Sequence, residues 1–436
     1  MERVLIKEVK PELDNKEITL AGWIHDIRDM SNIKFIVLRD ESGMVQVVAP
    51  KNDVDSSLFD EIPRLQQETV ISVDGVVKAS KQAKAGVEIL LKGLTVLSKS
   101  EPSLPIAVAE KGVETALSKR LDYRCLDLRK PRNRAIFNVQ SALVAGMEKW
   151  LQNNGYIQVF TPCIMGAASE SGSEVFKIQY YETQAFLRQD PQLHRQLTIA
   201  GGIEKLYDIG PSWRAEKSHT TKHICEHRAC AVEQAFIKDE SELLRAQEAL
   251  IVSALTTVRE RCSRDLQTLG VEVTVPKTPF PELRFPKIYE ILAEMGKKCD
   301  GDLDTEAEGL LWEYVKKKYG CEFYFFNRFP SKIKPFYVMF VDEDPKWARS
   351  IDLNFRGVEL SSGGQREHRY DKIMEHVRDK GMTPESVKWF TEFFRYGVPP
   401  HGGFAIGIER LTKQLLNLEN IREAVLFPRD PERLEP

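Results

Sequence analysis

Three short stretches of this sequence combine arginines, acids and glycines at spacings that could bind a polyphosphate. In the first, Arg214 and Glu216 stand at the end of a predicted strand, and His223 follows after a polar loop. An arginine in that position can hold a phosphate while the neighbouring glutamate accepts a hydrogen bond from the ligand. Taken by itself, the stretch is also explained by a surface hairpin with a charged tip.

The second stretch, residues 352–366, contains a pair of glycines, Gly363 and Gly364. We predict one strand over 351–360, whose alternation places Asp352 on one face and Glu359 on the other. Ser362 follows three residues after Glu359, and a carboxylate with a nearby hydroxyl can bind Mg²⁺ against a phosphate. A charged strand that ends in a glycine turn is the alternative interpretation.

The third stretch runs from His401 to Arg410 and contains three glycines before a predicted helix. Glycines allow a ligand to approach the backbone closely, and Arg410 in the first turn of the helix can reach an anion. A plain glycine-rich loop before a helix would show the same pattern.

The first hundred residues have the pattern of a small β-barrel. Asp40–Gly43 supplies a hairpin turn, and residues 99–105, with two prolines, read as a linker. Five strands in about eighty residues suit a closed OB-fold. The predicted strands are 18–24, 34–39, 44–49, 70–77 and 87–97.

Beyond the linker, long amphipathic helices alternate with strands. One helix ends at Asn153–Gly155 and a second runs from Ser241 to about Arg264. This order predicts an α+β domain with a largely antiparallel sheet flanked by helices. The sequence has neither a G-x-x-x-x-G-K-[ST] loop nor a G-x-G-x-x-G loop after a strand. The predicted strands are 156–160, 206–213, 231–237, 337–341 and 351–360.

Composition narrows the class of protein. The 436 residues carry a net charge of −3, which excludes a generally polycationic binder but allows one local basic face for nucleic acid. Seven cysteines without a C-x-x-C pair argue against a disulfide framework. With no apolar run of about 20 residues and no signal-peptide core, we expect a cytoplasmic protein that is not bound to a membrane.

The three stretches are recognisable together with Thr161-Pro162. Pro162, Arg214-x-Glu216 and Gly407-x-Glu409-Arg410 resemble the three ordered motifs of class II aminoacyl-tRNA synthetases. The strings GWIHDIRD, PQLHRQ, RGVELSSGGQREH and YGVPPHGGF are similar to those of archaeal and eukaryotic-type aspartyl-tRNA synthetases. The resemblance implies an OB-fold anticodon-binding domain over 1–100, a hinge over 101–130 and a class II catalytic domain over 131–436.

The same resemblance implies a site for ATP and Mg²⁺. Arg214 would hold the α-phosphate and Arg410 the γ-phosphate, and these two arginines would be catalytic. Glu359 and Ser362 would be the Mg²⁺ ligands. The implied ATP-binding residues are Arg214, Ala215, Glu216, Lys222, His223, Ile224, Glu359, Gly407, Ile408, Glu409 and Arg410.

The resemblance also implies a pocket for L-aspartate. Arg195 and Arg366 would pair with the side-chain carboxylate, and Glu170 and Gln192 would hold the ammonium group. Two guanidiniums that face a neutral asparagine amide would leave buried positive charge uncompensated, at a cost of about 3 kcal/mol or more. The implied aspartate-binding residues are Glu170, Gln192, Arg195, Arg214, Ser362 and Arg366.

Three positions depart from the family pattern. Arg195 stands where lysine is usual, and His227 where an aromatic ring often stacks on adenine. Ala231 stands where an aspartate usually supports the ammonium group. Either Glu170 holds that group with less help, or a different acid has moved into place.

Two of these positions also belong to a cluster of possible soft-metal ligands, His223-x-Cys225-x-His227-x-x-Cys230. Its spacing matches no common zinc loop. Zinc analysis of the purified protein decides whether it binds metal.

In the barrel, Arg28, Phe35 and Gln46 are candidate anticodon readers, since OB-folds stack single-stranded bases on aromatic rings beside cations. An ordinary core position is the alternative for Phe35.

His25 follows G-W, where relatives that charge both tRNA(Asp) and tRNA(Asn) tend to carry tryptophan. Lys84 resembles a lysine of those relaxed relatives. Base contacts specify sequence, so His25 favours tRNA(Asp), while tRNA(Asn) stays open as a second substrate.

The interpretation that these residues favour is a homodimeric aspartate–tRNA ligase, joined through the Pro162 segment. An asparaginyl-tRNA synthetase is the nearest alternative, because Ala215–Ser218 resembles that enzyme. An asparagine synthetase of this fold would lack the barrel. A paralogue that binds nucleic acid or a partner without catalysis is the alternative from a different class, and Ala231 keeps it open.

Overall fold

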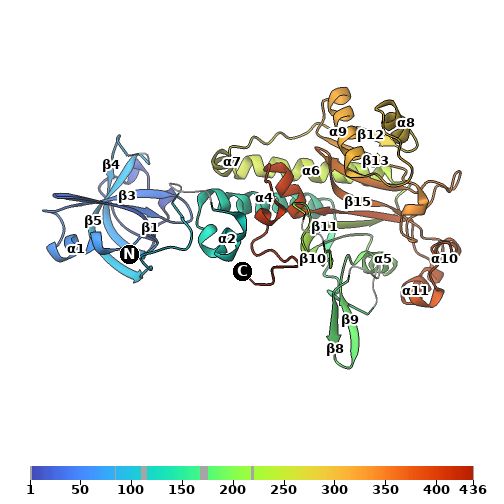
Figure 1. Cartoon of the computed structure of the whole chain (residues 1–436), viewed down its shortest axis with the longest axis horizontal. Helices are drawn as coiled ribbons and strands as arrows, with labels where there is room; N and C mark the ends of the chain where they lie inside the picture. The colour runs from blue at the N-terminus through green and yellow to red at the C-terminus, as the bar shows by residue number, and fades with distance from the viewer. Residues whose placement is uncertain (1, 84, 110–114, 167–174, 218–219, 436) are drawn as a thin grey trace. The chain divides into compact units, whose positions relative to one another are not determined.

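The computed structural model describes residues 2–435 except 84, 110–114, 167–174 and 218–219. The chain forms two compact units, Met1–Lys130 and Pro131–Pro436 (Figure 1). Each has its own hydrophobic core. Two predicted site residues, Lys84 and Glu170, lie outside the described part.

The first unit contains a closed five-stranded barrel in the order β1-β2-β3-β5-β4, as the OB-fold prediction requires. Only β3 and β5 pair in parallel. Alternate residues of each strand point inward, and Leu20, Ile36 and Val47 are among the fully buried ones. The strands are β1 (Glu17–Met30), β2 (Ile33–Arg39), β3 (Met44–Pro50), β4 (Val70–Ala79) and β5 (Val87–Ser98), and α1 (Ser56–Glu61) follows β3.

The second unit is built on an eight-stranded sheet in the order β12-β13-β14-β15-β16-β11-β10-β6. Every neighbouring pair is antiparallel except β12–β13 and β6–β10, which confirms the predicted α+β class. Its strands are β6 (Ile157–Gln158), β10 (Lys205–Trp213), β11 (Glu226–Ala235), β12 (Glu282–Arg284), β13 (Phe323–Asn327), β14 (Ser350–Phe355), β15 (Val358–Arg366) and β16 (His401–Gly407). A separate small sheet contains β7 (Ile164–Met165), β8 (Lys177–Tyr180) and β9 (Thr183–Leu187).

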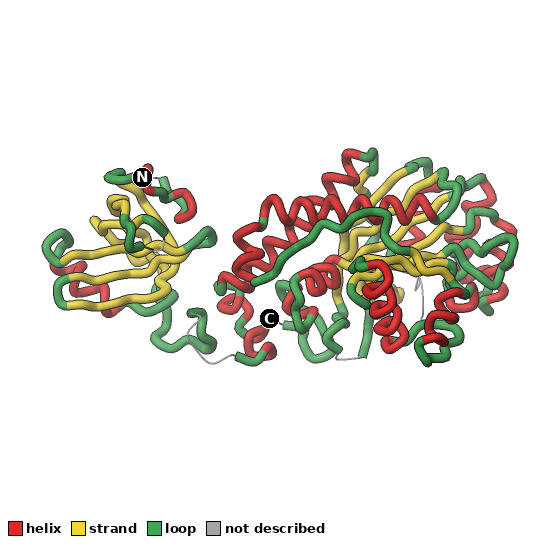
Figure 2. The backbone as a smooth tube through the Cα atoms, turned by 90° about the horizontal axis from the view of Figure 1, so that it is seen from above, coloured by secondary structure: helices red, strands yellow, loops and turns green. Residues whose placement is uncertain are grey.

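Two long helices, α4 (Pro131–Asn153) and α6 (Ser241–Arg261), pack side by side and share the main core with the sheet (Figures 1 and 2). They approach closely at Gly146, where a Cβ atom would lie 2.7 Å from Cα of Ala254. The other helices of this unit are α5 (Gln192–Ala200), α7 (Ser263–Leu269), α8 (Lys287–Glu294), α9 (Thr305–Tyr319), α10 (Tyr370–Asp379), α11 (Pro384–Thr391) and α12 (Ile408–Leu415).

Four details differ from the predicted elements. The predicted strand 351–360 is a hairpin, because Arg356 and Gly357 have φ of 49° and 77° and turn the chain between β14 and β15. Residues 337–341 form only isolated bridges. The second long helix ends at Arg261. The predicted hinge, residues 101–130, contains two short helices, α2 (Leu117–Asp122) and α3 (Arg124–Asp127).

Among the residues that the structure describes, none of the helices combines the length and the apolar character that a membrane span requires.

Candidate active site

A cavity of about 550 Å³ lies over the central strands of the second unit. Small residues leave its floor open: Ala229 on β11 and Gly407 on β16 are directly opposite each other. Many of the predicted site residues line it, although they come from distant parts of the sequence. These are Gln192, Arg214, Glu216, Lys222, His223, Ile224, Glu359, Ser362, Arg366, Gly407, Glu409 and Arg410. Ala215, Arg195 and Ile408 are not among the residues that line it.

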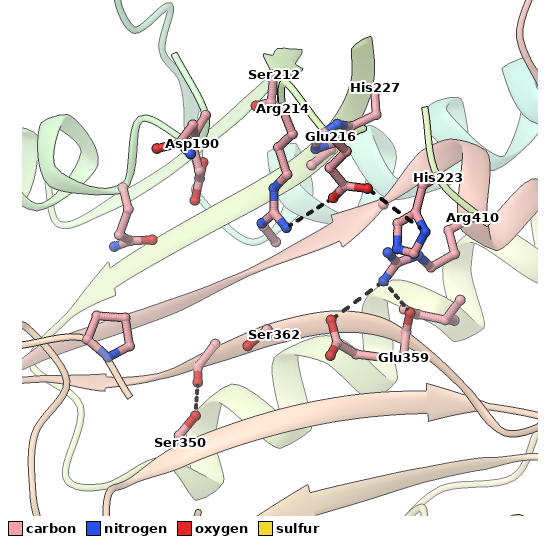
Figure 3. Close-up of a pocket in the computed structure, with 18 of the residues that line it drawn as sticks. Asp190, Ser212, Arg214, Glu216, His223, His227, Ser350, Glu359, Ser362 and Arg410 are labelled. Carbon is pink, nitrogen blue, oxygen red and sulfur yellow. Dashed lines mark hydrogen bonds and ion pairs between the residues drawn. The ribbon is translucent and has the colours of Figure 1, made fainter. Parts of the chain in front are cut away.

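Arg214 projects into this cavity just beyond the end of β10 (Figure 3). Its Nη1 lies 4.0 Å from Oε1 of Glu216, and Oε2 of Glu216 lies 3.9 Å from Nδ1 of His223. The Arg214 side chain is 45% exposed. The guanidinium is therefore held in place by Glu216 but still accessible to an anion.

A second arginine, Arg410, faces the cavity close to His223 and Glu359 (Figure 3). Nη1 of Arg410, in the first turn of α12, donates to the backbone oxygen of Glu359 at 2.8 Å and lies 3.6 Å from Oε1 of Glu359. The neighbouring Glu409 is buried and accepts from the backbone N–H of Arg228 at 2.9 Å. That bond fixes the start of α12 to β11 and so places Arg410.

The positive charges of both arginines act on the neighbouring ring of His227. Burial, reinforced by the charges of Arg214 and Arg410, lowers the pKa of His227 to about 4. The ring is therefore neutral at pH 7, and it lines the cavity. A neutral imidazole can offer its face to a planar base.

The residues around Ser362 fit a hard cation. Ser362 is opposite Asp352 on the neighbouring strand, and the buried Oδ1 of Asp352 has no hydrogen-bond partner among the residues that the structure describes. Burial raises the pKa of Asp352 to about 6. No three His, Cys, Asp or Glu side chains of the described residues form a metal-binding group. Mg²⁺ commonly takes one or two protein ligands and completes its shell with water and substrate phosphates. Glu359 and Ser362 suit that arrangement.

Arg366 marks the other end of the cavity and is part of a buried polar network. Its Nε donates to Oε1 of Glu233 at 2.9 Å, and its Nη2 donates to Oε1 of Gln192 at 2.9 Å. Nε2 of Gln192 donates to the second oxygen of Glu233 at 3.0 Å. Glu233 is fully buried, so this network fixes the Arg366 fork in one orientation.

Arg195 is buried and bound to a residue that the sequence analysis did not single out. Its Nη1 and Nη2 donate to the two carboxylate oxygens of Asp190, both at 2.8 Å. Nη2 also donates to Oε1 of Gln192 at 2.9 Å. Asp190, and not Arg195, lines the cavity.

Polar residues without a role in the predicted site also line the cavity, among them Ser212, Lys334, Tyr337 and Asp302. Lys334 lies 3.6 Å from Oδ2 of Asp352 and over the ring of Phe329. The sequence around it gives no signal, because it belongs to a segment predicted only as a connection. For Asp190 there was a signal, since it directly precedes the string PQLHRQ.

On the barrel, three predicted anticodon readers share one face. Arg28 on β1 is opposite Phe35 on β2, and Val37, two residues on, is opposite Gln46 on β3. Phe35 is half-buried, not part of the barrel core. Nε2 of Gln46 donates to Glu88 at 2.8 Å.

His25 occupies an irregularity in β1, where the pairing with β2 shifts register. Its Nδ1 lies 3.1 Å from Nη1 of Arg39. A guanidinium only donates, so Nδ1 accepts and the proton of the neutral ring is on Nε2. Nε2 is therefore the donor of this ring.

Comparison with known proteins assigns both parts of the chain. Residues 116–431 match the family model of "tRNA synthetases class II (D, K and N)", and residues 18–97 match "OB-fold nucleic acid binding domain". The aspartate–tRNA(Asp) ligase of Thermococcus kodakarensis is 44% identical over 431 residues, which are 98% of each chain. The aspartate–tRNA(Asp/Asn) ligase of Archaeoglobus fulgidus is 40% identical over 436 residues and 100% of each chain.

Solved structures agree with this assignment. The asparaginyl-tRNA synthetase from Pyrococcus horikoshii, solved with asparaginyl-adenylate, superposes with a TM-score of 0.93 at 32% identity and covers 100% of each chain. Aspartyl tRNA synthetase from Entamoeba histolytica gives a TM-score of 0.90 at 29% identity, over 100% of this chain and 93% of the other. The chain belongs to the class II tRNA synthetases of the D, K and N group, enzymes that here carry an N-terminal OB-fold nucleic acid binding domain.

Proposed function

We propose that this enzyme is an aspartate–tRNA ligase that activates L-aspartate with ATP and transfers it to tRNA. The observation that carries this proposal is the cavity itself. It has two accessible arginines, Arg214 and Arg410, at one end and an oriented guanidinium, Arg366, at the other. Such a cavity suits a triphosphate joined to a small acidic molecule.

In the first step, an oxygen of the substrate α-carboxylate attacks the α-phosphorus of ATP. The bond from that phosphorus to the bridging oxygen breaks, and pyrophosphate leaves. Arg214 stabilises the charge that develops on the α-phosphate, and Arg410 holds the far end of the chain of phosphates. Mg²⁺, held by Glu359 and Ser362, would neutralise phosphate charge. No protein nucleophile is required, because positioning and charge neutralisation supply the acceleration.

The second step transfers the aminoacyl group to the terminal ribose of tRNA. A ribose hydroxyl attacks the carbonyl carbon of the aspartyl-adenylate, and AMP leaves.

Two residues are suited to bind the adenine base of ATP. The neutral ring of His227 can stack on the base, and the carboxylate of Glu216 can accept a hydrogen bond from it.

Aspartate is favoured over asparagine by the positive charge of Arg366, whose Nε and Nη2 are bound to Glu233 and Gln192 and which lines the cavity. Among the solved structures, an asparaginyl-tRNA synthetase is 32% identical and an aspartyl tRNA synthetase 29% identical, whereas the aspartate–tRNA ligases of the sequence comparison are 38% to 44% identical. The relatives at these identities include ligases for tRNA(Asp) alone and ligases for tRNA(Asp/Asn). Their names leave the choice of tRNA open.

For tRNA, we propose that the barrel face of Arg28, Phe35 and Gln46 binds the anticodon. Phe35 would stack on a base, and Arg28, whose side chain is 64% exposed, would meet the phosphate backbone. His25 with its proton on Nε2 would hydrogen-bond a base edge, so we expect tRNA(Asp) to be preferred. Lys84, outside the described residues, would favour relaxed charging. With tRNA as its substrate, we expect the enzyme to act in the cytoplasm.

A homodimer through the Pro162 segment is supported by its exposed apolar side chains. Ile157, Phe160 and Ile164 are 55%, 84% and 47% exposed. The segment is fixed to the second unit, because the Thr161 hydroxyl donates to Asp208 on β10 and accepts from Arg188. Phe160→Asp is expected to convert a dimer into a monomer in sedimentation equilibrium, while the native chain sediments as a dimer. A monomeric native chain would contradict this proposal.

Charging of purified transcripts at one stated salt concentration tests the function. We expect aspartylation of tRNA(Asp) at a higher kcat/KM than tRNA(Asn). Equal efficiencies would show that the barrel does not discriminate and that Lys84 was the better guide. Charging of tRNA(Asn) with asparagine would replace the proposal with asparaginyl-tRNA synthetase, and no charging at all would favour the non-catalytic alternative.

A further inference from the structure

The carboxylate of Asp190 lies between a buried arginine and the cavity. Arg195, which is 1% exposed, holds both of its oxygens at 2.8 Å, whereas the Asp190 side chain is 26% exposed and lines the cavity. The bidentate geometry fixes the plane of the carboxylate.

The other acids of the described cavity lining are placed elsewhere. Glu216 lies beside Arg214 and His223, and Glu359 lies beside Arg410, so both are at the triphosphate end. Glu409 is buried against Arg228, and Asp302 stands in the connection before α9. At the Arg366 end, Asp190 is the acid that reaches the cavity in the described part of the chain.

Asp190 is also ionised. Burial by itself would raise the pKa of its carboxyl, but Arg195, Arg366 and Arg188 hold that pKa below its usual value. Glu233, the other acid nearby, is fully buried and occupied by Arg366 and Gln192. A cation that enters this end of the cavity therefore meets the negative charge of Asp190 first.

We propose that Asp190 receives the ammonium group of the amino-acid substrate and that Arg195 is the residue that positions Asp190. The inference rests on the proposed function, since it assigns the amino acid to this end of the cavity. A bound amino acid would direct its α-carboxylate to Arg214, its ammonium group to Asp190 and its side chain to Arg366. Figure 3 shows Asp190 and Arg214 on the same side of the cavity.

This assignment changes two expectations from the sequence. Arg195 acts through Asp190, because Arg195 does not line the cavity and both of its terminal nitrogens donate to Asp190. Ala231 is buried, with 3% exposure, and offers no charge. Asp190, in the connection before α5, thus supplies the negative charge that position 231 lacks.

Two stable adenylate analogues test the proposal: aspartyl-sulfamoyl adenosine and its counterpart without the amino group, succinyl-sulfamoyl adenosine. Both keep the adenosine and the side-chain carboxylate, so both report on an intact site. Asp190→Asn keeps the size of the side chain and removes its charge. We expect the variant to bind the aspartyl analogue about thirtyfold more weakly, in line with loss of one charge-assisted partner, and the succinyl analogue within threefold of the native enzyme.

An equal loss for both analogues would show that Asp190 only supports the site, and no loss for either would remove it from the site. The double variant Asp190→Asn/Arg195→Gln removes both charges of the pair together and protects against misfolding caused by an unpaired Arg195. It should show the same selective loss. If the two analogues then bind with the native ratio, the proposal is wrong.

Failure of the proposed function gives a different result. If the native enzyme prefers asparaginyl-sulfamoyl adenosine, the aspartate assignment fails, but the ammonium group is common to both amino acids. The Asp190→Asn comparison can then be repeated with the asparaginyl analogue. Binding of no aminoacyl analogue by the native enzyme would overturn both.

Discussion

Introducing the acid that Ala231 lacks should weaken this enzyme. Ala231 on β11 is directly opposite Asp208 on β10, and both are buried. Opposed residues of an antiparallel pair have Cβ atoms about 5 Å apart on the same face. Two carboxylates at about 5 Å, with an effective dielectric constant of about 20, repel by about 3 kcal/mol. Arg188, 3.4 Å from Asp208, offsets part of this, so the figure is an upper value.

The assay compares Ala231→Asp with Ala231→Asn, which has nearly the same volume and no charge. We expect the aspartate variant to unfold in urea with a free energy 2 to 3 kcal/mol lower at pH 8. A buried carboxyl beside another has a folded-state pKa above the unfolded value of about 3.9, so its destabilisation is full above the folded-state pKa and disappears as the pH falls below about 4. The difference between the variants should therefore shrink at pH 5.

Aspartate binding is expected to follow the same order, with a higher KM for Ala231→Asp than for the native enzyme in pyrophosphate exchange. The reason is that Asp190 already supplies the negative charge at this end of the cavity. If Ala231→Asp is as stable as Ala231→Asn and lowers the KM for aspartate, the reasoning is refuted, and Ala231 is a true loss that Asp190 does not replace.

Three further predictions concern the predicted site residues. Arg214→Ala should lower the rate of pyrophosphate exchange at least about a hundredfold, as expected for one preorganised charge donor, and an unchanged rate would remove Arg214 from the site. Arg366→Leu should abolish both exchange with aspartate and discrimination against asparagine, whereas Arg366→Lys keeps the charge without the fork; normal charging by the leucine variant would mean that the pocket is misassigned. Phe35→Ala should weaken tRNA binding in a filter assay by about tenfold to a hundredfold and leave exchange unaffected, because a stacked base contributes about 1 to 3 kcal/mol. Unchanged tRNA binding by the Phe35→Ala variant would show that Phe35 does not contact the tRNA.

Much of the fold follows from local patterns. The barrel strands were predicted because alternation and turn residues recur every few residues, and those signals depend only on neighbours in sequence. The hairpin at Arg356 and Gly357 was missed, since the alternation continues through a two-residue turn and only the φ values of 49° and 77° reveal it. As a result, Asp352 was placed on the same strand as Glu359, whereas the two stand on neighbouring strands.

A site residue could be predicted from the sequence only where it belongs to a recognisable motif. Arg214, Glu359 and Arg410 each belong to such a string, and the cavity brings the three together. Partnership between side chains is a property of the folded chain. The pairing of Arg195 with Asp190 depends on rotamers and burial, so the sequence placed Arg195 against the substrate instead.

Exchange of labelled pyrophosphate into ATP tests the central claim most directly, because it reports amino-acid activation without tRNA. At saturating ATP and Mg²⁺, we predict exchange that depends on L-aspartate and is about tenfold to a hundredfold less efficient, in kcat/KM, with L-asparagine, since a hydrogen bond between a carboxylate and the charged Arg366 contributes about 1.5 to 3 kcal/mol. Exchange driven by asparagine and not by aspartate would contradict the account.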